Sequence, residues 1–166
     1  MLTLGIDPGT ASFGFGLVAG KRHPNHIAHG CLTTPAGRSI GNRLALIRDG
    51  LLPLFDRYEI TVVAVEHLGY ARRITSAIDV SHAIALAHLL AADHDVPVEE
   101  YAPSEIKLAV TGYGASNKAR VQDMVQRLLE LPKVPQPNHA ADALAVAICH
   151  INSHTIRSIH RQIANR

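Results

Sequence analysis

The chain has 166 residues, 47% of them hydrophobic, and carries a formal net charge of +2 at pH 7. This length and composition predict one folded domain and exclude a disordered protein, while so small a net charge does not by itself indicate nucleic acid. No apolar stretch reaches the roughly 18 residues of a membrane span and the N-terminus lacks the basic and apolar regions of a signal peptide, so we expect a cytoplasmic protein with no membrane partner.

The first third of the chain reads as β-structure. Apolar runs separated by short turns predict an antiparallel meander. Gly14 and Gly16, inside the second run, would either admit something close to the backbone or permit a bulge. The three predicted strands are residues 2–6, 13–18 and 27–33.

The rest of the chain alternates helices with strands. Leu44, Ile47 and Leu51 fall at helical spacing. A helix between two strands implies a crossover, which makes the later strands parallel. Helices are predicted at about 39–58, 74–93, 103–110, 118–131 and from 138 onward, and strands at 61–66 and 96–101.

This order predicts an α/β fold with a five-stranded mixed sheet, three antiparallel strands followed by two parallel ones, flanked by helices on both faces. We expect a single domain over residues 1–153. Residues 154–166 contain arginine and histidine but no acid. They are predicted to form a basic C-terminal tail that is disordered, binds DNA, or does both.

Two strands of the predicted sheet end in a carboxylate. Asp7 follows the first apolar run and Glu66 follows the fourth. A lone charge is rarely placed in a core without a partner. Because ligands gather at the carboxyl ends of strands in such sheets, we expect Asp7 and Glu66 to face a shared metal ion.

His139 and Asp142 open an otherwise apolar segment near the C-terminus. Their spacing of three places them on one helix face. Asp142 alone is equally explained as an acid favoured in the first turn of a helix. Together with Asp7 and Glu66, the pair indicates a site for Mg²⁺ or Mn²⁺. Two such ions can clamp the attacking and leaving oxygens of a phosphodiester, with Asp7 as the bridging ligand.

Several short motifs occur together and in order along the chain: Gly5-Ile6-Asp7-Pro8-Gly9-Thr10, Val65-Glu66, Lys107, Lys118 before a Val-x-x-Met-Val helix, and Ala140-Ala141-Asp142-Ala143-Leu144-Ala145. By these motifs the chain resembles the bacterial RuvC family of Holliday-junction resolvases from residue 1 to about residue 153. The resemblance implies a ribonuclease H-like fold and a homodimer that makes paired nicks across a four-way DNA junction with Mg²⁺ or Mn²⁺. It also implies a branch-migration motor complex of the RuvA and RuvB type.

The resemblance assigns roles to residues of this sequence. Asp7, Glu66 and Asp142 match the metal-binding acids of the family. Lys107 and Lys118 match basic residues near its active site, where they would hold the scissile or a neighbouring phosphate. Without the resemblance, both lysines read as ordinary surface residues.

His139 departs from the family pattern, because many members carry aspartate at this position. Imidazole is a softer and neutral ligand that suits Mn²⁺ better than Mg²⁺. We therefore expect a preference for Mn²⁺. The alternative is that His139 orients water or carries a proton near neutral pH.

The loop after Glu66 is the second departure. Family members usually place an aromatic residue here, whereas this chain has glycine at the aligned position and Tyr70 one place later. Tyr70 is predicted to stack on a DNA base, with Arg72 and Arg73 on phosphates. The alternative is a tyrosine half-buried over the loop.

The alanine-rich helix at 74–93 is predicted to form the homodimer interface, through a two-fold contact. Sequence alone equally allows this helix to be core within a monomer.

Other functions remain open at this point. Asp7-Pro8-Gly9-Thr10 also fits the phosphate loop of actin-like and sugar-kinase ATP-binding proteins, but that class needs two such domains. A related ribonuclease H-like nuclease could act on RNA or on other branched DNA. Because of His139, the interpretation as a catalytically weak junction-binding module also stays open.

Overall fold

The structure is a computed structural model that describes residues 1–21, 23–67 and 74–164. Five strands form one sheet in the order β3-β2-β1-β4-β5. The first three pair antiparallel, and β4 and β5 continue the sheet parallel to β1. This confirms the predicted mixed sheet. The strands are β1 (Leu2–Asp7), β2 (Ser12–Ala19), β3 (Asn25–Thr33), β4 (Val62–Glu66) and β5 (Val98–Tyr101).

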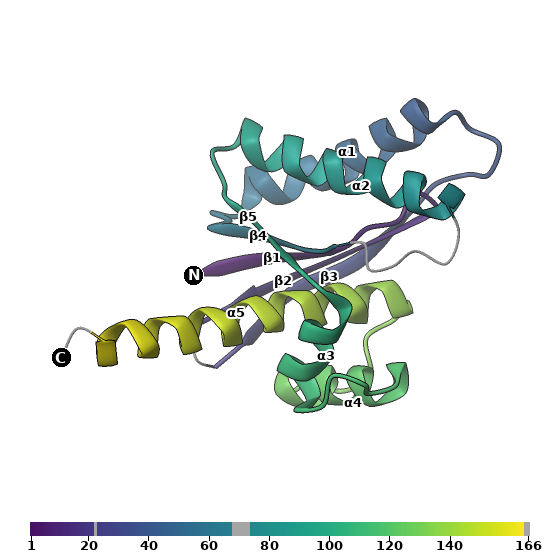
Figure 1. The fold of residues 1–166 in the computed structure, drawn as a ribbon. Coiled ribbons are helices and arrows are strands. Elements are labelled where there is room, and N and C mark those ends of the chain that lie inside the picture. The colour runs from purple at the N-terminus through teal and green to yellow at the C-terminus, as the bar shows by residue number, and fades with distance from the viewer. Residues whose placement is uncertain (22, 68–73, 165–166) are drawn as a thin grey trace.

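Helices cover both faces of the sheet (Figure 1). The helices α1 and α2 pack over one face, and α5 lies directly against the other with α3 and α4 on its outer side (Figure 1). None of the helices in the described ranges is long and apolar enough to cross a membrane. The helices are α1 (Ile40–Arg57), α2 (Ile74–Asp93), α3 (Pro103–Thr111), α4 (Lys118–Leu128) and α5 (Asn138–Ala164).

Two helix ends differ from the sequence-based expectation. The helix α4 stops at Leu128, three residues earlier than predicted, because Glu130 takes a left-handed φ of 50°. The Leu131 N–H then closes the turn by donating to the Gln126 carbonyl at 2.9 Å. The second difference is at the C-terminal end of α5, because this helix continues to Ala164. The predicted tail at 154–166 therefore begins inside a helix, and its contact with DNA stays a prediction.

The two faces of the sheet carry side chains of very different size. Alternate residues of a strand point to opposite faces. Leu4 and Ile6 of β1 are buried toward α1 and α2. On the opposite face β1 presents Gly5 and Asp7, and β2 presents Gly14 and Gly16, which are paired with Asp7 and Gly5.

The glycines allow α5 to pack against bare backbone. A Cβ atom built on Gly5 would lie 2.1 Å from the Ala143 carbonyl oxygen, and one on Gly14 would lie 2.1 Å from the His139 carbonyl oxygen. No side chain fits in either gap. Of the two alternatives for Gly14, the structure shows the close approach. The first turns of α5 are therefore held against the ends of β1 and β2.

Replacing Gly5 with alanine tests this contact. The added methyl must push α5 away from the sheet, so we expect Gly5→Ala to lower the free energy of unfolding by about 1–3 kcal/mol or more. Gly41→Ala is the matched control, since nothing lies within 4 Å of a Cβ there. At this helical position alanine should stabilise by about 0.4–1 kcal/mol. Urea unfolding measures both, and equal stabilities would contradict the packing described here.

Candidate active site

The sheet brings Asp7 and Glu66 to one edge. They are the last residues of β1 and β4, two neighbouring parallel strands. Ile6 pairs with Val65 in the register, so the two carboxylates follow at the same level. The juxtaposition predicted from the strand ends is therefore present.

The first turns of α5 add two more side chains to this edge. His139 Nδ1 lies 2.7 Å from Asp7 Oδ2. Asp7, His139 and Asp142 each offer a ligand atom, and these three atoms lie within 4.8 Å of one another. Glu66 is outside this trio. Its role as a fourth ligand stays a prediction.

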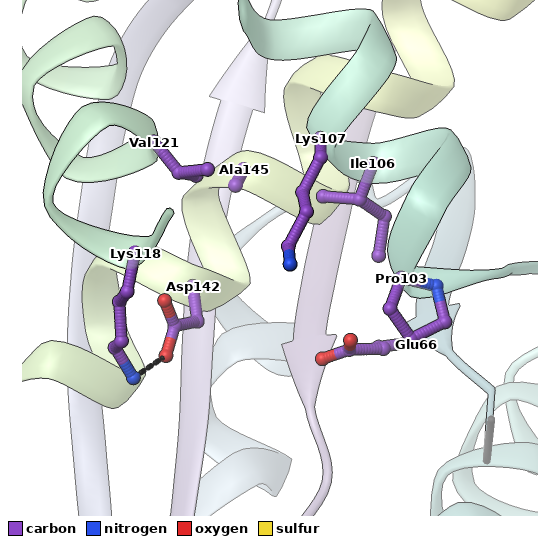
Figure 2. A pocket seen from close by; sticks show the side chains of 8 residues that line it. All are labelled: Glu66, Pro103, Ile106, Lys107, Lys118, Val121, Asp142 and Ala145. Carbon is purple, nitrogen blue, oxygen red and sulfur yellow. Dashed lines mark hydrogen bonds and ion pairs between the residues drawn. The ribbon is translucent and has the colours of Figure 1, made fainter. Parts of the chain in front are cut away.

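Glu66 instead lines an adjoining pocket of about 300 Å³ that also contains both predicted lysines. Figure 2 shows Glu66, Lys107, Lys118 and Asp142 around this pocket. Lys118 Nζ donates to Asp142 Oδ2 at 2.5 Å. One apolar wall comes from α3, α4 and α5, and consists of Pro103, Ile106, Val121 and Ala145.

The site holds more negative charge than its own cations offset. Burial, together with the charges of Asp7 and Asp142, raises the pKa of Glu66 to about 7. Burial also raises the pKa of Asp7, against the opposing effect of its hydrogen bond to His139. Carboxyl groups with raised pKa values clustered in a cleft are typical of functional sites.

These residues fit a divalent cation. Carboxylate oxygens and one imidazole nitrogen are ligands that Mg²⁺ and Mn²⁺ accept. A cation here would also lower the electrostatic repulsion that raises the pKa of Glu66. A hydrogen bond donated by the His139 ring to Asp7 would fix the orientation of that ring, as partners of metal-bound histidines commonly do.

The predicted DNA-stacking residue Tyr70 and its neighbours Arg72 and Arg73 lie outside the described residues. Their proposed contacts with DNA stay predictions. The sequence predicts a loop between α3 and α4 but assigns it no function. A usable signal was present, because this loop connects the two helices that carry Lys107 and Lys118.

The sequence model of the family "Crossover junction endodeoxyribonuclease RuvC" matches residues 3–150. The chain belongs to the RuvC family. A curated family member from Thermomicrobium roseum is 42% identical over 150 residues, which cover 90% of this chain and 92% of that protein. The RuvC family is a family of divalent-metal nucleases, which agrees with the ligand set of Asp7, His139 and Asp142.

Solved structures give the same result. The structure of Thermus thermophilus RuvC in complex with a Holliday junction substrate superposes with a TM-score of 0.89 at 31% identity, covering 95% of this chain and 96% of that one. The yeast mitochondrial Holliday junction resolvase Ydc2 has a TM-score of 0.68 at 12% identity, covering 98% of this chain and 84% of that one. The second likeness shows the fold alone. The predicted ribonuclease H-like fold is confirmed.

The raised pKa of Glu66 makes the stability of the metal-free protein depend on pH. The folded chain keeps a proton on Glu66 up to about pH 7, whereas the unfolded chain releases it near its ordinary pKa of 4.5. The contribution of Glu66 to stability is therefore most favourable below about pH 4.5 and is lost as the pH rises through 7. We expect Glu66→Gln to be more stable than wild type at pH 8 by roughly 1–3 kcal/mol, with the difference vanishing toward pH 4.5.

Thermal or urea unfolding at several pH values, in the presence of a chelator, measures this difference. Glu59→Gln, at an exposed acid before β4, is the control and should follow wild type at each pH. If the stability of Glu66→Gln changed with pH in the same way as that of wild type, the raised pKa of Glu66 would be contradicted.

Proposed function

We propose that this chain is a crossover junction endodeoxyribonuclease that resolves four-way DNA junctions during recombination and repair. It hydrolyses phosphodiester bonds and leaves paired symmetric nicks. The observation that carries the proposal is the meeting of Asp7, His139 and Asp142 beside a pocket lined by Lys107 and Lys118. A related chain with the same fold, T. thermophilus RuvC, has been solved with a Holliday junction substrate.

In this proposal the carboxylates and the lysines divide the work. Asp7, Glu66, His139 and Asp142 would hold the two divalent cations. When bound, these cations would activate a water and offset charge on the departing oxygen. Lys107, which faces the pocket, binds the scissile or an adjacent phosphate (Figure 2). Lys118 leaves its ion pair with Asp142 to do the same.

DNA contacts outside the pocket follow from the sequence. Tyr70 stacks on a base at the open junction, and Arg72 and Arg73 bind phosphates. The basic segment 154–166 extends the contact along the DNA. These assignments rest on residue type and on the resemblance of the chain to the RuvC family.

Two copies of the chain act together on the symmetric junction. Support comes from α2, where Ile78 is 52% exposed and Leu89 is 60% exposed, although the opposite side of this helix is buried. Covering this apolar side with a second copy would remove it from water. We place the homodimer in the cytoplasm, with a motor complex of the RuvA and RuvB type as its partner.

Cleavage of a synthetic four-way junction tests the proposed activity. We expect paired symmetric nicks in the junction, none in a linear duplex of matched sequence, and no cutting when metal is removed. Asp7→Asn should lower the rate by about 100-fold or more, because it removes a central metal ligand. Asp56→Asn, at an exposed acid on α1, is the control and should cut like wild type. Equal cutting of junction and duplex would contradict junction selectivity.

The imidazole of His139, as a proposed metal ligand, predicts a preference for Mn²⁺ over Mg²⁺. Wild type should cut faster in saturating Mn²⁺ than in saturating Mg²⁺, because imidazole is the softer ligand. His139→Asp should shift the preference toward Mg²⁺. If the variant is instead slow in both metals, His139 acts as a proton carrier, and equal wild-type rates would count against the Mn²⁺ preference.

A further inference from the structure

The loop between α3 and α4 is tied down by one hydroxyl group. Thr111, the last residue of α3, accepts a hydrogen bond at Oγ1 from the Tyr113 N–H at 3.1 Å. The same oxygen lies 2.7 Å from Ser116 Oγ. The Ser116 N–H in turn donates to the Tyr113 carbonyl at 3.1 Å. Backbone atoms on both sides of the Tyr113 side chain are therefore fixed.

The loop folds back along α3 toward the pocket. Gly112 ends α3 with a left-handed φ of 75°, which reverses the direction of the chain. A Cβ atom built on Gly114 would lie 3.3 Å from the carbonyl oxygen of Ser104, in the first turn of α3. Ser104 follows Pro103, which lines the pocket. Tyr113, next to Gly114, therefore belongs to a loop that returns to the first turn of α3, one residue from the pocket-lining Pro103.

Tyr113 presents its ring to solvent at this position. Tyr113 is 63% exposed, and Leu108 of α3, which lies against Gly114 of the same loop, is 56% exposed. Lys107 precedes Leu108, and Lys118 begins the helix after the loop. An exposed aromatic ring on the loop that joins two lysine-bearing helices matches the composition of surfaces that bind a nucleic-acid strand.

We propose that the Tyr113 ring is a stacking surface for a nucleotide of the DNA strand that is cut in this pocket. The proposal rests on the proposed function, because it takes the strand at the pocket to be the substrate. Lys107 and Lys118 bind phosphates on either side, and the ring packs on the base between them. Stacking tolerates every base, so Tyr113 positions the strand without selecting its sequence.

Junction binding, measured by fluorescence anisotropy with Ca²⁺ in place of Mg²⁺ to suppress cutting, tests the proposal. Tyr113→Ala should weaken binding about 5-fold or more, while Tyr113→Phe should bind like wild type. The dependence of affinity on salt separates stacking from charge. Tyr113→Ala should leave the slope of log K against log salt unchanged, whereas Lys107→Met should reduce it by about 1.

Two controls keep the result interpretable. Leu46→Ala removes another exposed apolar side chain, on α1 across the sheet, and should not change binding. Thermal unfolding of Tyr113→Ala should match wild type, since the ring is exposed. Unchanged affinity of Tyr113→Ala, or an equal loss in Tyr113→Phe, would overturn the stacking role. A wild type that binds duplex as tightly as junction would overturn the proposed function instead, and the Tyr113 comparison would then be made on the duplex.

Discussion

The contact between α5 and the glycine-lined face of β1 and β2 is the constraint on which the site depends. Helix backbone approaches strand backbone so closely that Gly5 and Gly14 leave no room for a side chain. Any larger residue would lift the start of α5, which carries His139 and Asp142. The ligand atoms of these two residues would then move away from Asp7, which belongs to the sheet. Core packing and ligand geometry are therefore set by the same few backbone contacts.

That geometry concentrates negative charge at a cost in stability. Burial removes solvation from these carboxylates, and Asp7, Glu66 and Asp142 also repel one another. Both effects raise the pKa of Glu66. Lys118 offsets part of the charge through Asp142, and His139 bonds to Asp7. The arrangement is understandable if it is built for a cation rather than for the empty protein. Bringing like charges together in this way lowers stability without a cation, a trade-off typical of functional sites.

Much of this was predictable, because it follows from local patterns. Runs of Val, Ile and Leu ending in Asp7 and Glu66 specify both the strands and the edge where their carboxylates meet. Gly14 remained ambiguous from sequence, because a bulge and a close approach use the same residue. The place of Tyr113 was not predictable, since it depends on the Thr111 hydroxyl and on the return of the loop to Ser104. Such contacts have no periodic signature. The end of α4 likewise depends on the backbone of Glu130, which residue type alone does not dictate.

The pairing of Asp7 with His139 also orders events during synthesis. The two residues are 132 positions apart in the chain, and α5 is synthesised after every strand of the sheet. A nascent chain that has made only its five strands still lacks His139 and Asp142, two of the three residues of the candidate metal site. Since the chain is synthesised from its N-terminus, the cluster of Asp7, His139 and Asp142 can assemble only after α5 has been made. A chain whose synthesis stops before α5 therefore lacks His139 and Asp142 and cannot form this cluster.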